Sequence, residues 1–255
     1  MKGEAAHARR LAADAMACIG FYTRLPLSAT VASFAAAQWA APLAGAVIGL
    51  VSGGVLWTVV LAGAPAPVAA AAALGAGMLA TGALHEDGLA DVADGFGGGR
   101  NRDEKLDIMR DSRVGTYGVL VLVVSVLARW AALAAVAGAG SFAALLALVA
   151  AHAASRALMP LFMMRVPPAR GDGLSAGIGR VEGAVAFAAL AIGGFFLVLA
   201  GPFFTLLSAV LLAVWFLILE RLCRRQIGGQ TGDVLGALQQ GGEAAVLITA
   251  SAMLA

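Results

Sequence analysis

The chain has 255 residues and a formal net charge of +2, with 61% hydrophobic and 13% charged residues. Soluble domains carry about 25% charged residues, so this composition, with a mean hydropathy of +0.90, indicates a membrane protein. The small net charge gives nucleic-acid binding no electrostatic basis. Cys18 and Cys223 lie far apart in the sequence, which argues against a disulfide framework or a metal motif.

Residues 1–26 predict a helix that lies at the membrane interface. Apolar residues recur there at helical spacing: Ala5, Ala8, Leu11, Ala12 and Ala15. Arg9 and Arg10 lie beside them, and Glu4 and Asp14 interrupt the segment in a way that disfavours a signal peptide. The sequence leaves open that this helix is only an anchor.

Seven apolar runs follow, each close to the roughly 20 residues that cross a bilayer as a helix. We therefore predict an all-α polytopic membrane protein with about seven transmembrane helices, in one integral-membrane domain over residues 1–255. The runs are 38–61, 68–84, 117–136, 142–164, 183–200, 203–219 and 234–254.

The connections between the runs alternate in charge. Segments 62–67, 137–141 and 200–202 carry no charge, whereas the other connections are rich in arginine. The positive-inside rule places the arginine-rich connections in the cytoplasm, together with the N-terminus. The C-terminus is then periplasmic. Because the uncharged loops are too short to hold a site, we expect the chemistry on the cytoplasmic face.

More than half of the 15 acidic residues lie in segment 85–118, HEDGLADVADGFGGGRNRDEKLDIMRDSRVGTYG. Asp87, Asp91 and Asp94 have i, i+4, i+7 spacing, which places them on one helix face within roughly 60°. Glu86 points about 100° away and is a second-rank candidate. Like charges at this spacing destabilise a helix unless a cation neutralises them. Mg²⁺ takes oxygen ligands along with substrate phosphates, so the segment 85–116 predicts a cytoplasmic catalytic loop.

The run GFGGG (95–99) is expected to end this helix and to leave backbone N–H groups free to approach an anion. A second acidic stripe follows at helical spacing: Asp103, Asp107 and Asp111. Arg110 and Arg113 flank its last member. Folded together at a glycine hinge, the two stripes would hold one or two metal ions beside a phosphate.

Simpler interpretations stay open for the same segment. Residues 102–107 could form a salt-bridged exposed helix with no chemical role. The first stripe directly continues an apolar run, where unpaired charge is costly, and this favours a functional interpretation. His85 is either an acid–base group or an interfacial polar residue.

Four ionisable residues lie inside the apolar runs: Arg129, His152, Arg156 and Glu243. Such residues usually face the protein interior or a wet cavity and indicate function. We expect a cavity open to the cytoplasm, in which Arg129 and Arg156 meet an anionic substrate. The alternative is a buried structural pair between Arg129 and Glu243, and His152 is better explained as a core residue.

Two glycine-rich loops complete the cytoplasmic face. In IGGQTGDVLGA (227–237), Thr231 or Asp233 could cap the last helix, or the helix N-terminus could bind an anion. The other loop, RGDGLSAGIGR (170–180), is expected to be flexible and to face the substrate.

The chain resembles the cobalamin synthase family, the adenosylcobinamide-GDP ribazoletransferases. The resemblance rests on HEDGLADVADGFGGG (85–99) followed by IMRDSRVGTYG (108–118), which together are highly specific. It extends to FYTRLP (21–26), SR (155–156) and GGQTGDVLGA (228–237), and so covers essentially the whole chain. One departure is Gln240, where the family often has Glu.

This resemblance implies a bacterial or archaeal inner-membrane phosphotransferase that acts late in cobalamin (vitamin B12) biosynthesis. Family members join adenosylcobinamide-GDP to α-ribazole, or to its 5'-phosphate, release GMP, and need Mg²⁺. A ribose hydroxyl attacks the pyrophosphate of the corrinoid-GDP substrate. The resemblance places the protein in membrane lipid with its active site facing the cytoplasm, and a homo-oligomer is left open.

The family motifs and the charge pattern together assign roles to individual residues. The predicted Mg²⁺ ligands are Asp87, Asp91, Asp94 and Asp111. The predicted substrate and phosphate contacts are Arg110, Arg113, Arg156, Arg129, Thr231, Asp233 and Glu86. The hydroxyl proton would pass to one of the carboxylates or to His85.

Two rival functions share some of these features. A CDP-alcohol phosphotransferase would also begin its acidic pattern as DVADG (91–95), but its remaining glycine and aspartate spacing is missing. A transporter would tolerate charged residues within its spans. However, the polar groups here favour one face, and no half-repeat is visible.

Overall fold

The computed structural model describes residues 2–254, and this part of the chain is almost entirely helical. It contains no β-strand, only one isolated bridge between Pro168 and Gln230. The predicted all-α fold is therefore confirmed. The helices are α1 (Lys2–Tyr22), α2 (Phe34–Ala37), the 3₁₀ helix η1 (Gln38–Ala40), α3 (Ala41–Leu61), α4 (Ala66–Thr81), α5 (Leu84–Gly98), α6 (Arg102–Ile108), α7 (Thr116–Ala139), α8 (Ser141–Arg165), α9 (Leu174–Ile178), α10 (Gly183–Val198), α11 (Pro202–Gln226) and α12 (Gly232–Leu254).

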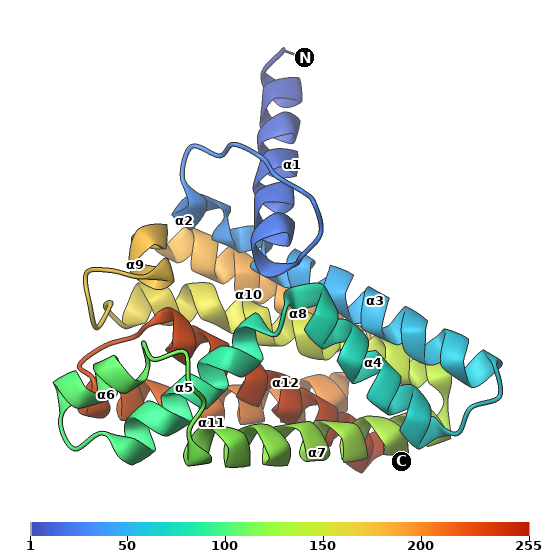
Figure 1. Ribbon diagram of the computed structural model, residues 1–255. Coiled ribbons are helices and arrows are strands. Elements are labelled where there is room, and N and C mark those ends of the chain that lie inside the picture. Colours follow the sequence, from blue (N-terminus) through green and yellow to red (C-terminus); the bar gives the residue numbers. More distant parts are fainter. Residues whose placement is uncertain (1, 255) are drawn as a thin grey trace.

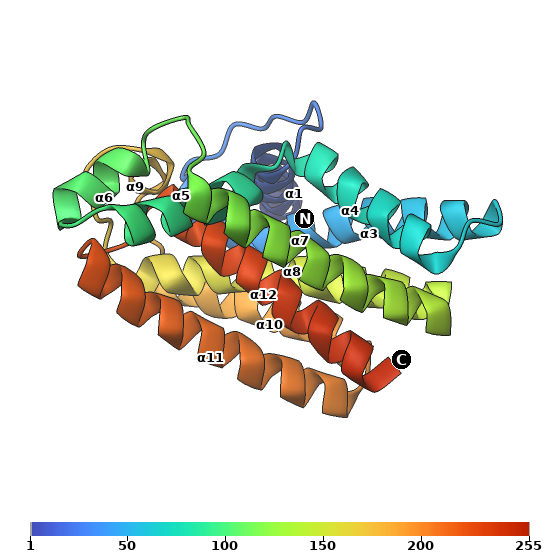
Figure 2. The same cartoon turned by 60° about the horizontal axis from the view of Figure 1, so that its bottom comes forward.

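Helix α8 is the centre of the bundle. It packs against α3, α10 and α12, and α12 in turn contacts α5, α7 and α11. Figures 1 and 2 show the long helices lying side by side, with α5, α6 and α9 gathered at one end. Most of the apolar stretch of α8 is buried, 78% of it, whereas the corresponding stretch of α7 is 22% buried. Helix α7 therefore presents its apolar side to the surroundings, as expected in lipid.

Four segments are long and apolar enough to cross a membrane, namely Phe34–Leu61, α7, α8 and α11. The protein is therefore a multi-pass membrane protein. All seven predicted runs are helical, but the count of seven crossings is not confirmed. Helix α10 has only 16 residues, about 24 Å at 1.5 Å per residue, short of the roughly 30 Å hydrocarbon layer. In α12, Gln239, Gln240 and Glu243 interrupt the apolar run.

Helices α4 and α5 pass the same test only as a pair, and they are bent by 89°. The bend is built from two left-handed residues, Gly82 with φ +66° and Ala83 with φ +57°. Helix α5 then crosses the end of the bundle where α6 lies (Figure 1). Because it carries Asp87, Asp91 and Asp94 at that end, we place α5 outside the membrane-spanning segments.

Helix α1 confirms the predicted N-terminal helix and projects from the bundle (Figure 1). Its last turn is anchored by buried Tyr22, whose hydroxyl donates to Gln38 Oε1 at 2.7 Å. Further out, Trp39 Nε1 donates to Asp14 at 3.1 Å. The placement of this helix at a membrane interface, like the orientation of both termini, stays a prediction.

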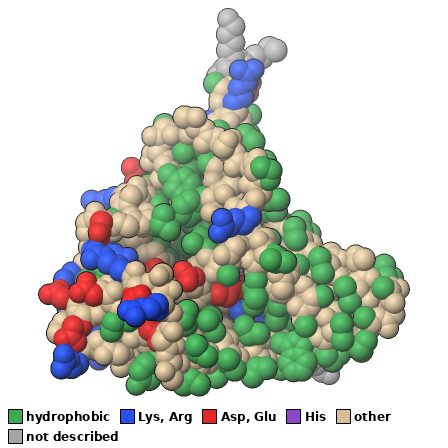
Figure 3. Space-filling model, viewed as in Figure 1, with side chains coloured by type: hydrophobic (Ala, Val, Ile, Leu, Met, Phe, Trp, Pro, Cys, Tyr) green, Lys and Arg blue, Asp and Glu red, His purple; other side chains and the backbone are tan. Residues whose placement is uncertain are grey.

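Charge is concentrated at one end of the molecule. In Figure 3 the acidic and basic side chains gather over the region of α6, while the surface over α3, α4 and α7 is largely apolar. This distribution matches a bundle embedded in lipid with one polar end in water. The candidate site lies at that end.

Candidate active site

The predicted acidic stripe lies on one helix, as expected. Asp87 is exposed, Asp91 is half-buried and Asp94 is buried, all on α5. Within residues 2–254, the carboxylates of Asp87 and Asp91 have neither a hydrogen bond nor an ion pair. The three therefore divide into two groups: Asp87 and Asp91 are uncommitted, while Asp94 is engaged with the backbone.

Both oxygens of Asp94 accept backbone hydrogen bonds at the start of α7. Gly115 donates to Oδ2 at 2.7 Å and Gly118 donates to Oδ1 at 2.8 Å. The first N–H groups of a helix lack partners within the helix, and a carboxylate there also interacts favourably with the helix dipole. The geometry gives Asp94 a clear structural role, while its predicted part in metal binding stays a prediction.

Asp233, at the start of α12, joins the two free carboxylates. Burial, followed by the charges of Asp87, Asp233 and Asp94, raises the pKa of Asp91 to about 7. A carboxyl with such a pKa is in an environment with excess negative charge. Among residues 2–254, no three acidic, histidine or cysteine side chains are arranged to hold a metal ion by themselves.

Helices α5 and α12 approach closely, and this brings Asp87 beside Asp233. A Cβ placed on Gly88 would lie 2.9 Å from the Cα of Asp233, so glycine permits the contact. Thr231 donates its hydroxyl to Asp233 at 3.0 Å and accepts the N–H of Val234 at 3.3 Å. Thr231 therefore caps α12, which confirms the structural interpretation of that loop.

Arg170 is the site residue that the sequence reasoning did not single out. Its Nη2 lies 3.7 Å from a carboxylate oxygen of Asp233, and its charge acts to lower the pKa of Asp91. Within residues 2–254, its Nε and Nη1 are buried without a hydrogen-bond partner, and Nε lies 3.7 Å from a carboxylate oxygen of Asp172. Segment 170–180 was predicted only as a substrate-facing loop, because nothing in the sequence shows that it folds back against α12.

A short backbone pairing holds that loop in place. Ala169 donates to the carbonyl of Gln230 at 2.8 Å, and Gln230 donates to the carbonyl of Pro167 at 2.9 Å. Arg102 of α6 donates to the carbonyls of Ile227 and Ala169 and so ties α6 to both loops. Three segments distant in sequence thus form one surface beside the α5 carboxylates.

The glycine run was expected to end the first helix and act as a hinge, and the helix does end within this run, but only at its last members. Helix α5 continues through Gly98, and Gly95 serves close packing instead. A Cβ on Gly95 would lie 2.5 Å from Met109 Cγ and 2.9 Å from the carbonyl oxygen of Lys105. The small size of these glycines lets α6 lie directly on α5. The backbone N–H groups of the run are used within helix α5.

The second acidic stripe does not form one helix face. Helix α6 ends at Ile108, so Asp111 lies beyond it. Asp103 and Asp107 are exposed, with ion pairs to Arg102 at 3.0 Å and Arg110 at 3.9 Å. These contacts confirm the interpretation of this stretch as a salt-bridged exposed helix.

Asp111 nevertheless lies near one member of the first stripe. It lines a surface hollow of about 440 Å³ together with Asp94, Arg113 and Tyr117. Arg113 donates to both oxygens of Asp111, at 2.6 Å for the shortest contact, and these bonds lower the pKa of Asp111. Exposed pairs of this kind contribute little to stability, so both groups can exchange partners.

Arg110 is engaged in a similar way. Its Nη2 donates to both oxygens of Asp172, at 2.8 and 2.9 Å. Because Asp172 and Arg170 belong to the same loop, Arg110 joins the connection after α6 to the loop that carries Arg170. The predicted contacts of Arg110 and Arg113 with substrate phosphate stay predictions.

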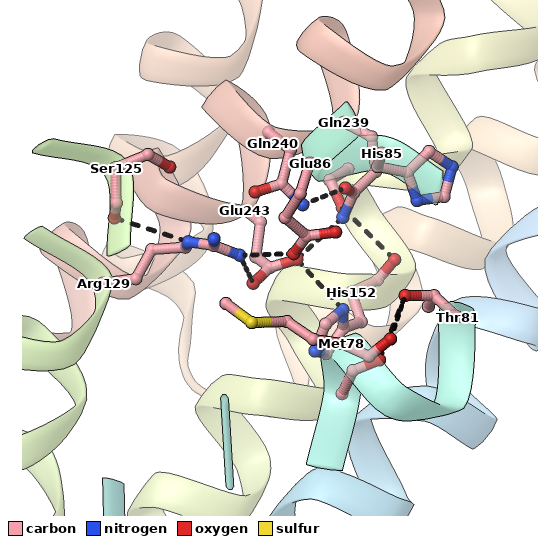
Figure 4. A network of polar contacts seen from close by, with 12 residues as sticks. Met78, Thr81, His85, Glu86, Ser125, Arg129, His152, Gln239, Gln240 and Glu243 are labelled. Carbon is pink, nitrogen blue, oxygen red and sulfur yellow. Dashed lines mark hydrogen bonds and ion pairs between the residues drawn. The ribbon is translucent and has the colours of Figure 1, made fainter. Parts of the chain in front are cut away.

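The intramembrane charges form a buried network, drawn in Figure 4. Arg129 Nη1 contacts Glu243 at 3.0 Å and Glu86 at 3.3 Å. His152 Nδ1 lies 3.1 Å from the second oxygen of Glu243, which also accepts from Gln239 at 2.8 Å. The structural pair between Arg129 and Glu243 is therefore confirmed. Glu86 also contacts Arg129, because the Glu86 side chain points away from the aspartate stripe of α5.

Arg156 connects this network to His85. It is 1% exposed, contacts His152 Nδ1 at 3.1 Å and donates to His85 Nδ1 at 3.2 Å. A guanidinium has only donors, so His85 Nδ1 must accept. Burial and then the charge of Arg156 hold the pKa of His85 well below its ordinary value. His85 is neutral, with its proton on Nε2, so this nitrogen is a donor and an unsuitable proton acceptor.

Comparison with known proteins agrees with this arrangement of motifs. The family model described as cobalamin-5-phosphate synthase matches residues 14–251. The adenosylcobinamide-GDP ribazoletransferase of Mesorhizobium japonicum is 49% identical over 249 residues, which cover 96% of this chain and 95% of the relative. That of Bradyrhizobium diazoefficiens is also 49% identical with the same coverage. No solved structure matches the chain.

A third relative, the adenosylcobinamide-GDP ribazoletransferase of Azorhizobium caulinodans, is 44% identical over 94% of this chain and 95% of its own length. These matches span the polar end and the apolar bundle alike, and they confirm the predicted resemblance. The chain belongs to the cobalamin-5-phosphate synthase family.

Proposed function

We propose that this chain transfers the adenosylcobinamide-phosphate moiety of adenosylcobinamide-GDP to α-ribazole, or to its 5'-phosphate, and releases GMP. The product is adenosylcobalamin or its 5'-phosphate, so this is the late step that assembles the nucleotide loop of cobalamin. A ribose hydroxyl of the acceptor attacks the phosphorus next to the corrinoid. A new phosphorus–oxygen bond forms there, the pyrophosphate bond breaks, and the hydroxyl proton leaves to a base.

One observation carries the chemistry of this proposal. Asp87, Asp91 and Asp233 lie together at the polar end of an apolar bundle, beside the guanidinium of Arg170. Phosphoryl transfer depends mainly on positioning and on neutralising charge at the phosphates. The cluster supplies negatively charged carboxylates, and Arg170 supplies a positive charge with hydrogen-bond donors that are not all used. Groups of both charges are therefore available for this purpose.

The residues of the cluster take distinct roles in the proposal. Arg170 donates to a phosphate oxygen through its Nε and Nη1, which make no hydrogen bond within residues 2–254. Arg110 and Arg113 exchange their exposed carboxylate partners for phosphate oxygens, which suits guanidinium geometry. The proton acceptor is one of the α5 carboxylates, because Arg156 fixes His85 as a donor.

We further propose that Mg²⁺ binds at Asp87 and Asp91. Their carboxylates are uncommitted, oxygen is the ligand that Mg²⁺ prefers, and one or two carboxylates with substrate phosphates make a usual magnesium site. When bound, the ion neutralises negative charge that develops on the transferred phosphoryl group. The proposal needs no third protein ligand, in keeping with the arrangement of the described side chains.

The proposed location is a bacterial inner membrane, with the carboxylate cluster facing the cytoplasm. The arginine-rich connections all lie at the end of the bundle that carries α5, α6 and α9 (Figures 1 and 3). There a water-soluble nucleotide can reach a site held at the membrane surface.

The direct test is GMP release by the purified full chain in liposomes. We expect release from adenosylcobinamide-GDP only when α-ribazole or its 5'-phosphate is present, with formation of the corresponding cobalamin. Parallel rates with the two acceptors decide which one the chain prefers. CMP release from a CDP-alcohol, or corrinoid uptake without turnover, would support the rival functions and refute this one.

A further inference from the structure

A small cavity lies next to the carboxylate cluster and has aromatic and aliphatic walls. Its volume is about 120 Å³. This is well below the 300–1,000 Å³ usual for drug-sized ligands, so a single ring system fits and a whole nucleotide does not. Its lining includes Tyr22, His85, Met159 and Leu235, together with Asp87 and Asp233 of the carboxylate cluster.

His85 supplies this cavity with an unused hydrogen-bond donor. Its side chain is 2% exposed, and its Nε2 has no hydrogen-bond partner within residues 2–254. Because Nδ1 accepts from Arg156 at 3.2 Å, Nε2 carries the proton. Figure 4 shows the His85 ring directed away from Glu243 and the buried network. A buried donor without a partner is costly, which indicates where a ligand acceptor belongs.

Tyr22 makes the wall beside this donor apolar. Its ring stacks on that of His85, with centroids 5.9 Å apart and an angle of 27° between the planes. Its hydroxyl is already used, since it donates to Gln38. Tyr22 therefore offers the cavity a ring face and no free polar group. Within residues 2–254, the polar groups of the lining that have no partner are the His85 donor, the Ser175 hydroxyl and the Asp87 carboxylate. The Asp233 carboxylate also lines the cavity but accepts from Thr231 and faces Arg170.

We propose that this cavity holds the aromatic base of the acceptor nucleoside, with His85 Nε2–H donating to the unprotonated ring nitrogen of that base. The inference rests on the proposed function, in which α-ribazole is the acceptor. Its base, dimethylbenzimidazole, is a fused ring with one such nitrogen and two methyl groups. Asp87 and Asp233 line the same cavity, so the attached ribose lies beside the carboxylate cluster.

The walls favour this base over the guanine of the other substrate. Guanine presents a ring N–H and an amino group in addition to acceptors, and each donor would need its own partner when buried. The two carboxylates of the lining are engaged elsewhere, Asp87 with the proposed Mg²⁺ and Asp233 with Thr231 and Arg170. Dimethylbenzimidazole needs one donor and apolar contact, which is what His85, Tyr22, Met159 and Leu235 provide.

The test compares α-ribazole with an analogue in which the free ring nitrogen is replaced by C–H. GMP release is measured with the full chain in liposomes, at saturating adenosylcobinamide-GDP. For the wild type we expect the KM of the analogue to be roughly 10- to 100-fold higher, the usual effect of leaving a buried donor unpaired. In His85→Phe the two acceptors should have the same KM, while the KM of adenosylcobinamide-GDP stays within about twofold of the wild type.

The matched control is His152→Phe. His152 contacts the same guanidinium, Arg156, at 3.1 Å, but it does not line the cavity. This variant disturbs the network without removing the donor, so it should keep the preference for the ring nitrogen. If His85 had a purely structural role, His85→Phe would instead raise the KM of α-ribazole and the KM of the analogue equally. The ratio of these two values would then stay unchanged.

Three results would overturn the inference: equal use of both acceptors by the wild type, an unchanged preference in His85→Phe, or a rise in the KM of adenosylcobinamide-GDP alone. The last would assign the cavity to guanine. The wild-type comparison needs no variant, so it decides even if His85→Phe misfolds.

Equilibrium binding of α-ribazole to the wild type and to His85→Phe separates the two proposals. His85-dependent binding without GMP release refutes the proposed function alone, and GMP release without a nitrogen preference refutes this inference alone.

Discussion

Asp94 Oδ1 accepts the backbone N–H of Gly118 at 2.8 Å, so a side chain of α5 caps the N-terminus of α7. Its other oxygen accepts the N–H of Gly115. Loss of a helix cap costs about 1 kcal/mol and up to about 2. Asp94→Asn turns one acceptor into a donor facing a donor, so we expect the free energy of unfolding to fall by roughly 1–2 kcal/mol. Thermal unfolding in detergent measures this loss.

Asp91→Asn is the matched control for that measurement. It makes the same chemical change one helical turn earlier, where the carboxylate has no hydrogen bond within residues 2–254. Its Tm should equal the wild-type value or exceed it, because a crowded negative charge is removed. If Asp94→Asn kept the wild-type Tm and lost all activity, Asp94 would act chiefly as a metal ligand instead.

Loss of activity without loss of folding is expected at Asp87 and Asp91. Asp87→Asn and Asp91→Asn each remove an uncommitted carboxylate from the cluster around Asp233. Removal of one group that stabilises charge in the transition state typically lowers the rate by roughly 10²–10³-fold. GMP release at saturating substrates measures it. Near wild-type rates at limiting Mg²⁺ in either variant would refute their assignment to the metal.

Local patterns in the sequence were enough to predict the helices and the acidic stripe. The i, i+4, i+7 spacing of Asp87, Asp91 and Asp94 correctly placed them on one helix. Periodicity cannot show which neighbour each residue meets. Asp94 faces the backbone of α7 and Asp87 lies beside α12, because the packing of the bundle differs along α5.

The errors came from residues whose role depends on contacts distant in sequence. Gly95 was expected to break a helix, because glycine has a low helix propensity. That propensity is a property of the residue alone and takes no account of its neighbours in the fold. In the structure, α6 packs against Gly95, and the close contact outweighs that propensity. Arg170 was missed for the same reason, since only the pairing of Ala169 with Gln230 brings its loop to Asp233.

The ion pair between Arg129 and Glu243 should be essential for stability. Both side chains are at most 2% exposed, and Arg129 also contacts Glu86. Arg129→Met leaves two buried carboxylates without this cation. Removing one partner of a buried pair costs about 3–5 kcal/mol, so we expect a large fall in Tm and in the yield of folded protein.

Arg165→Met serves as the control for the buried pair. Arg165 is about half exposed, and its partner Glu220 keeps a second arginine, Arg224, at 3.2 Å. Exposed pairs contribute about 0–1 kcal/mol, so this variant should unfold close to the wild-type temperature. Equal Tm values for Arg129→Met and Arg165→Met would show that the buried network does not stabilise the fold.

The affinity for Mg²⁺ should depend on pH through Asp91. Its pKa is raised to about 7, so it takes up a proton as the pH falls below that value and then has no charge to offer a cation. Mg²⁺ affinity should therefore be full above about pH 8 and fall by up to about tenfold per unit below pH 7, as one proton competes with the ion. Chelation by EDTA should abolish GMP release, and added Mg²⁺ should restore it.

Asp111→Asn is the control, because Arg113 lowers the pKa of Asp111 and keeps it ionised throughout this range. The Mg²⁺ concentration for half-maximal release, measured between about pH 6 and 8, should change with pH in the wild type and in Asp111→Asn alike. Direct Mg²⁺ binding to Asp91→Asn should be weak and independent of pH, and a pH-independent affinity in the wild type would exclude Asp91 as a ligand.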